Sequence, residues 1–255
     1  MATRAPGIRF LYGLPAAIAG RTLIISDLHI GIEDRLFSKG VRLGDVSENM
    51  LSGIEKIARE NRIERIAITG DVKERIEAPD AQVMEFFRRL SKIAKVVVAK
   101  GNHDGGIERV EGIELIGASG GIIRAGGMKI GLFHGHAAPD GALFGCDYVF
   151  CGHEHPTIEM TNRFGGVDRF HAWIKIPIDP KMAKKEFKKA NPKCAIYIVP
   201  PFNPAVGGNA LNRGGAGFMG PIFKNGIFKL SEAEIITLEG TGLGALFESQ
   251  RENSG

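Results

Sequence analysis

The sequence contains few cysteines and no long apolar run. Its 255 residues include three cysteines, Cys146, Cys151 and Cys194, and this odd number does not form a disulfide framework. No apolar run reaches the roughly 18 residues of a membrane span, and the apolar stretch 11–20 is followed at once by Arg21 and a buried strand. We therefore expect no membrane partner, no cleaved signal peptide and a reducing, cytoplasmic location.

The sequence also lacks internal repeats and low-complexity tracts. With 44% apolar and 24% charged residues, its composition is that of an ordinary globular protein. We expect a single domain over residues 1–255, with an irregular C-terminal elaboration from about residue 177. The formal net charge of +4 and the pI near 9.0 suit an anionic substrate but do not identify nucleic acid by themselves. They leave the oligomeric state open.

The first half of the chain alternates apolar strands with amphipathic helices. The apolar patterns predict strands at 22–26, 65–69 and 96–99, and helices at 45–61 and 80–93. Two strand–helix–strand units with short connections imply parallel strands whose carboxyl ends meet at one edge of the sheet.

The second half has shorter apolar segments separated by glycines. We expect strands at 113–116, 121–124, 128–133, 148–151, 157–160, 167–174, 195–199, 227–230 and 234–238, a helix at 181–190, and a long loop at 200–221. This pattern predicts a second, more antiparallel sheet packed on the first, in an α/β fold with helices outside.

Five short polar segments each follow a predicted strand. The segments are Asp27-Leu28-His29, Gly70-Asp71, Gly101-Asn102-His103-Asp104, His134-Gly135-His136 and Gly152-His153-Glu154-His155. They hold six of the seven histidines, and His171, beside Trp173, is interpreted as structural. In an extended chain, residues two apart point to the same side, so Asp27 and His29 can reach one ion.

These residue types predict a metal site. Carboxylate, imidazole and amide oxygen suit Mn, Fe and Zn, whereas a structural thiolate zinc site needs cysteine ligands. Two ions need a bridging carboxylate, for which Asp71 is the natural candidate. The pattern indicates two divalent ions that hydrolyse phosphate esters; Mn is the expected assay metal, and Fe and Zn are the alternatives.

The five segments, in this order, resemble the calcineurin-like metallophosphoesterases. The opening Ile-Ile-Ser-Asp-Leu-His-Ile-Gly and the late Val-Pro-Pro-Phe-Asn-Pro-Ala-Val-Gly-Gly-Asn resemble its prokaryotic branch of ICC-like phosphoesterases related to the SbcD nuclease subunit. The resemblance implies a four-layer sandwich in which two mixed β-sheets pack face to face and helices flank them.

The resemblance also implies roles. The first metal would be bound by Asp27, His29 and His155, the second by Asn102, His134 and His153, and Asp71 would bridge them. His103 would protonate the leaving oxygen, and Asp104 would orient it. His136 and Asn203, the latter in the 200–221 loop, are candidate substrate contacts. Glu154 lies between two ligands and is expected to point away from the site.

The substrate is less well specified than the metal site. We expect a phosphoester substrate, with phosphodiesters and in particular DNA or RNA preferred; a phosphomonoesterase or a cyclic-nucleotide phosphodiesterase are the alternatives. A non-catalytic scaffold is disfavoured because no ligand is missing. The family's second segment often reads Gly-Asp-x-x-Asp, and Arg75 is interpreted as replacing its second carboxylate. A cation there would favour monoesters if it faced the site.

Overall fold

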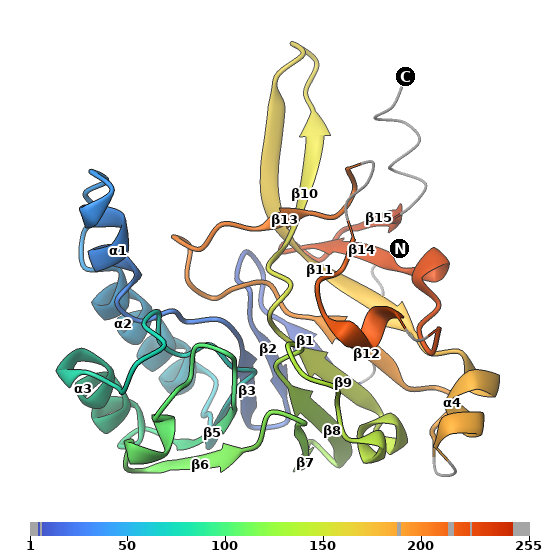
Figure 1. Ribbon diagram of the computed structural model, residues 1–255, viewed down its shortest axis with the longest axis horizontal. Coiled ribbons are helices and arrows are strands. Elements are labelled where there is room, and N and C mark those ends of the chain that lie inside the picture. Colours follow the sequence, from blue (N-terminus) through green and yellow to red (C-terminus); the bar gives the residue numbers. More distant parts are fainter. Residues whose placement is uncertain (1–4, 6, 188–189, 214–216, 225, 247–255) are drawn as a thin grey trace.

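In the computed structural model, two β-sheets pack face to face (Figure 1). The structure describes residues 5, 7–187, 190–213, 217–224 and 226–246. Between the sheets lies an apolar layer to which Ile24 and Val97 contribute from the first sheet and Leu132 and Phe150 from the second. This architecture is the predicted α/β sandwich of two mixed sheets.

The first sheet has six strands in sequential order. They are β1 (Ile8–Phe10), β2 (Ala17–Ala19), β3 (Thr22–Ile25), β4 (Arg65–Ile68), β5 (Lys95–Ala99) and β6 (Ile113–Ile116). As predicted, β3, β4 and β5 are parallel. The strand at 113–116 was expected in the second sheet, but it is β6 and pairs in parallel with β5, so that prediction is wrong. The short antiparallel strands β1 and β2 were not predicted.

The second sheet has nine strands. They are β7 (Gly121–Ala125), β8 (Met128–Phe133), β9 (Tyr148–Cys151), β10 (Pro156–Thr161), β11 (Val167–Pro177), β12 (Ala195–Ile198), β13 (Asn209–Ala210), β14 (Glu234–Thr237) and β15 (Gly242–Ala245). A parallel centre of β8, β9 and β12 is flanked by mostly antiparallel strands. Each sheet thus has a parallel part whose strand ends can present ligands.

The outer face of the first sheet is covered by helices α2 (Val46–Glu60) and α3 (Ala81–Leu90). Asp45 and Asp80 cap them, each accepting a hydrogen bond from a backbone N–H of the first turn. The apolar faces of the two helices, including Ile54 and Phe87, are buried against the sheet.

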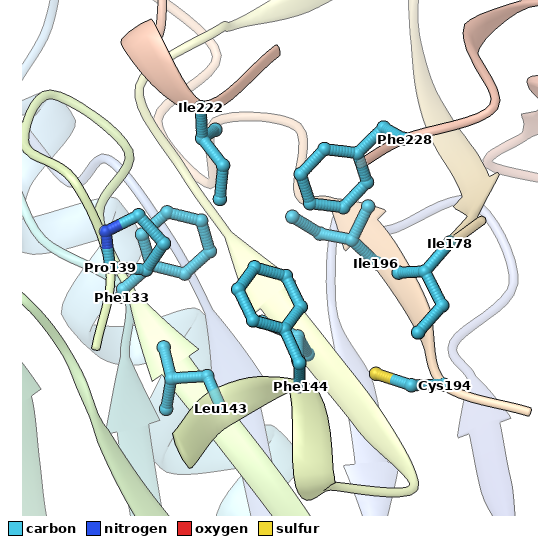
Figure 2. A pocket seen from close by; sticks show the side chains of 10 residues that line it. Phe133, Pro139, Leu143, Phe144, Ile178, Cys194, Ile196, Ile222 and Phe228 are labelled. Carbon is cyan, nitrogen blue, oxygen red and sulfur yellow. The ribbon is translucent and has the colours of Figure 1, made fainter. Parts of the chain in front are cut away.

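The outer face of the second sheet is covered by a less helical layer. It consists of α4 (Pro180–Glu186) and the 3₁₀ turns Gly141–Gly145, Pro221–Lys224 and Leu230–Glu232; a further 3₁₀ turn, Ile107–Arg109, precedes β6. Figure 2 shows Phe144, Phe228 and Ile222 converging there on a small apolar pocket. Its lining carries no charged side chain and leaves essentially no room for water, so it is part of the core.

Other local features also differ from the predictions. The strand expected at 227–230 is wrong: Phe228 forms one isolated bridge with Ile178, and a 3₁₀ turn begins at Leu230. The predicted helix 181–190 corresponds to α4, which ends at Glu186, and residues 188 and 189 lie outside the described part. Helix α1 (Ile32–Ser38) was not predicted. Among the described residues, no helix has the length and apolar character to cross a membrane.

Candidate metal centre

The predicted ligands lie at the carboxyl ends of the parallel strands and form two groups. Asp27 and His29 follow β3, and His155 follows β9; their ligand atoms all lie within 4.8 Å of one another. A second group consists of Asp71, His134 and His153, which follow β4, β8 and β9, and its ligand atoms also lie within 4.8 Å of one another. Both sheets therefore contribute ligands to each group of potential metal ligands.

Asp71 faces both groups. Its Oδ2 lies 3.8 Å from His29 Nε2 and 3.2 Å from His134 Nε2. Asn102 belongs to the second group, since its Oδ1 lies 3.2 Å from His134 Nε2. This arrangement places one carboxylate where a bridging ligand would be needed.

The backbone of the ligand residues is strained. Six non-glycine residues in the described part of the chain have a positive φ, and five of them are predicted ligands: Asp27, His29, Asp71, His153 and His155. Such a conformation costs about 1–3 kcal/mol per residue and persists where the surrounding structure enforces it, which is typical of functional sites. Ordinary packing gives no reason to concentrate this cost on the ligands.

The outer partners of three histidines fix which ring nitrogen faces the site. His134 Nδ1 lies 2.8 Å from the Thr69 carbonyl oxygen, and His103 Nδ1 lies 2.6 Å from the Glu74 carbonyl oxygen. Because a carbonyl only accepts, each Nδ1 carries the proton, and the Nε2 of His134 is left as a ligand. His29 Nδ1 likewise lies 2.9 Å from Glu74 Oε2.

Glu74 corrects the interpretation of Arg75. Counted from Gly70, the fifth position of Gly-Asp-x-x-Asp is Glu74, so the carboxylate that supports the ligands is present. Glu74 also forms an ion pair with Arg35. Arg75, in contrast, is exposed, and its Nη2 lies 3.5 Å from Asp34 Oδ2. The second segment therefore retains its outer support for His29.

The backbone N–H and carbonyl of His103 are held by two side chains. Its N–H donates to Asp71 Oδ1 at 2.9 Å, and its carbonyl accepts from the buried Lys73 Nζ, which also binds the Glu77 carbonyl. Asp104 was expected to orient the ring of His103. Instead, its carboxylate accepts from the N–H groups of Gly101 and Val72 and so fixes the loop that carries His103.

The C-terminal loop returns to the ligand segments. Asn203 is fully buried and donates to the Leu28 carbonyl at 2.7 Å, so the prediction that it binds substrate is wrong: it anchors the loop to the first ligand segment. Glu154 points away from the site, as expected. Its carboxylate accepts from Met219 N and Gly220 N at 2.8 and 2.7 Å.

The two remaining histidines differ in their distance from the centre. His136 is half-buried, and its ring centroid lies 5.3 Å from that of His134 and 6.2 Å from that of His153, so a role in contacting substrate stays a prediction. His171 Nδ1 lies 3.4 Å from the Pro156 carbonyl, which agrees with a structural role.

The charges and unpaired atoms of the centre fit divalent ions. Asp27 and Asp71 are buried. Burial would raise the pKa of Asp71, but the hydrogen bond and charge of His134 in its protonated form outweigh it and lower the pKa. A metal ion at Nε2 would supply the positive charge in place of that proton. Burial and the neighbouring His134 lower the pKa of His153 to about 4, which keeps its ring neutral and able to bind a metal. The buried His29 Nε2 has no hydrogen-bond partner among the described residues.

The sequence profile of the calcineurin-like phosphoesterase superfamily domain matches residues 21–167, more than half of the chain. The chain belongs to this superfamily. The match spans all five ligand segments, so membership rests on the part of the chain that builds the centre. The two groups of potential ligands agree with a metal-dependent phosphoesterase.

Of three similar solved structures, the first supports the same fold, and the other two are weaker matches. A Pseudomonas putida nuclease, MPE, matches with 20% identity and a TM-score of 0.53 over 88% of this chain and 89% of that chain. An archaeal phosphodiesterase matches with 14% identity and a TM-score of 0.40 over 74% and 88% of the two chains. An Escherichia coli phosphoesterase, YfcE, matches with 12% identity and a TM-score of 0.40 over 88% and 98%. No curated protein matches the chain significantly.

Sequence reasoning on this phosphoesterase missed Lys73 and Glu74. Both lie in the segment that begins at Gly70, but no local pattern shows that Lys73 is 1% exposed and bound to backbone carbonyls. For Glu74 the signal was present in the spacing of the second segment.

Proposed function

We propose that this phosphoesterase hydrolyses phosphodiester bonds with two divalent ions, Mn being the first to test. The strained backbone of Asp27, His29, Asp71, His153 and His155 supports this proposal most strongly. A fold used only as a scaffold would have no need to retain that strain together with a full set of ligands.

The ligand residues divide between the two ions. Asp27, His29 and His155 would hold one ion, and Asn102, His134 and His153 the other, with Asp71 between them. When bound, such ions act as Lewis acids that activate water and offset the charge of the phosphate. Glu74 and the Thr69 carbonyl keep His29 and His134 in the tautomer that binds a metal.

His103 supplies the proton. With Nδ1 donating to the Glu74 carbonyl, its Nε2 is the nitrogen that can give a proton to the departing oxygen once the ring is protonated. Lys73 and Asp71 fix the peptide of His103 from two sides. The ring is therefore positioned by the chain before substrate arrives.

One observation favours phosphomonoester hydrolysis as a second candidate function. Arg35 is half-exposed and pairs with Glu74, the partner of His29, so a guanidinium lies beside the first ligand group. A monoester carries one more negative charge than a diester and gains more from such a cation.

The test compares bis-p-nitrophenyl phosphate with p-nitrophenyl phosphate in the presence of Mn, after the metal content of the purified protein has been measured. We expect a higher kcat/KM for the diester. A strong preference for the monoester that is lost in Arg35→Gln would replace the proposal with a phosphomonoesterase.

A further inference from the structure

Two projections extend the chain directly from the metal centre. The helical arm, α1 with residues 39–44 after it, begins three residues after His29; the hairpin arm, β10 and β11 with their turn, begins directly after His155. The ring centroids of His29 and His155 lie 5.3 Å apart, so both arms start beside the same ligand group. Figure 1 shows both arms rising toward the top of the view.

Each arm exposes a phenylalanine beside an arginine. Phe37 on the helical arm is 59% exposed and Phe164 at the hairpin turn is 82% exposed; the other phenylalanines in the described part of the chain are buried or half-buried. The Cζ of Arg42 lies 5.5 Å from the ring centroid of Phe37, and that of Arg163 lies 4.8 Å from that of Phe164. Two ring faces and two guanidinium groups are thus displayed on opposite arms.

The hairpin turn is shaped to present its ring. Asn162 Oδ1 accepts from the N–H groups of Phe164 and Gly166 at 3.0 and 2.9 Å, and its Nδ2 donates to Asp168 at 3.2 Å. The ring is exposed although the turn around it is hydrogen-bonded. The ring can therefore contact a partner without a rearrangement of the turn that carries it.

The reach of the arms selects for an extended substrate. The five residues Thr157–Thr161, paired with β11, span roughly 17 Å at the rise of a strand, and the seven residues of α1 span about 10 Å. A small phosphate ester bound at the ligands would not contact Phe164. A polymer that passes through the centre could contact both arms.

We infer that the two arms bind single-stranded nucleic acid, with bases stacked on Phe37 and Phe164 and phosphates contacted by Arg42 and Arg163. This inference rests on the proposed phosphodiesterase function. Aromatic faces beside guanidinium groups are the chemistry by which proteins hold unpaired bases. In a duplex the base faces are already stacked on one another, so the arms select unpaired strands.

The test compares Phe37→Ala, Phe164→Ala and the double variant with Tyr12→Ala, a matched control that removes an equally exposed ring, 81% exposed, between β1 and β2. Binding of a fluorescein-labelled oligodeoxythymidine is measured by anisotropy, and kcat/KM is measured on the same strand and on bis-p-nitrophenyl phosphate. We expect each single variant to weaken strand binding roughly fivefold to a hundredfold, with unchanged kcat/KM on the small diester. Tyr12→Ala should match wild type on both.

Several results would overturn the inference. The first is a double variant that binds the strand as tightly as wild type, and the second is a loss of kcat/KM on the small diester equal to that on the strand. The third is a wild-type protein that binds a duplex as tightly as the single strand. The fourth is a protein dimer that the variants dissociate while strand cleavage is unchanged. Wild-type protein that cleaves the small diester but binds no strand would overturn the inference about the arms and leave the proposed phosphodiesterase function intact. Protein that binds the strand as expected but cleaves no diester would refute the proposed function, whereas strand binding by the arms would remain supported. Oligouridine in place of oligodeoxythymidine distinguishes RNA from DNA.

Discussion

The metal centre and the two arms are built in opposite ways. In the centre, Asp27 and Asp71 are buried, and the rings of His134 and His29 are fixed by a carbonyl and a carboxylate partner behind them. On the arms, Phe37 and Phe164 are exposed and contact arginines across their ring faces. The centre is therefore fixed before substrate binds, whereas the arms leave their side chains free for a partner.

This difference assigns the chemical step to the centre and the binding of a polymeric substrate to the arms. His29 and His155 end two segments of potential metal ligands, and the arms begin within three residues of them. A change in the centre should affect every substrate, and a change on an arm should affect only polymers. The predictions below test this division, beginning with the largest effect.

Replacing the bridging carboxylate should have the largest effect. We expect Asp71→Asn to lower kcat by more than roughly a thousandfold on every phosphodiester and to reduce the content of both metals, because its Oδ2 faces ligands of both groups. Metal content by plasma mass spectrometry and kcat on bis-p-nitrophenyl phosphate measure this. Glu60→Gln, an exposed charge removal at the end of α2, is the control, and an active, fully loaded Asp71→Asn protein would refute the bridging role.

Removing the proposed proton donor should have a smaller and substrate-dependent effect. We expect His103→Ala to keep its metals and to lose about 100- to 10,000-fold in rate on alkyl diesters, with a much smaller loss on aryl diesters, whose leaving groups need no proton. Rates across a series of leaving groups measure this. Equal losses for all leaving groups would remove His103 from the acid role.

Substitutions at the neighbouring residues Glu74 and Arg75 test which of the two supports His29. Glu74→Gln removes the charge that His29 Nδ1 contacts and should weaken Mn binding roughly 10- to 100-fold. Arg75→Gln removes an exposed charge that faces Asp34 and should leave Mn binding near wild type. Titration calorimetry with Mn measures both; a larger effect for Arg75→Gln than for Glu74→Gln would contradict the support of His29 by Glu74.

A glycine in the centre should be needed for close approach. A Cβ added at Gly101 would collide with the Oδ1 and backbone N of Asp71, whereas one added at Gly117 would meet open space. We expect Gly101→Ala to lower the free energy of unfolding by about 1–3 kcal/mol and Gly117→Ala to change it little. Urea unfolding of both variants measures this, and equal stabilities would show that the loop adjusts at no cost.

The sequence predicted the elements whose signal is local. Strands β3, β4 and β5 are continuous apolar runs, and α2 has clear helical periodicity, so their positions were predicted within a few residues. Strands β1 and β2 are three residues each, and Ala17–Ala19 has a composition that does not favour strands. They exist because β2 pairs with the edge of β3 and β1 pairs in turn with β2, which is a tertiary effect.

At the site, too, the sequence predicted local features and missed contacts between distant residues. The ligand segments could be proposed because each follows a strand end, where the chain position determines the place in space. The choice of Asn102 and His134 within their segments came from the family resemblance. The contacts of Asn203 with Leu28 and of Glu154 with Gly220 join residues far apart in sequence. Such contacts are visible only once the loop is folded back, so the sequence suggested a substrate role for Asn203 where the structure shows an anchor.

The most direct test of the account is anomalous diffraction from crystals of the protein grown with excess Mn. We expect two Mn peaks, one among Asp27, His29 and His155 and one among Asn102, His134 and His153, with Asp71 between the two. A single peak with no second ligand group around it, or no peak near these residues, would contradict the two-metal account.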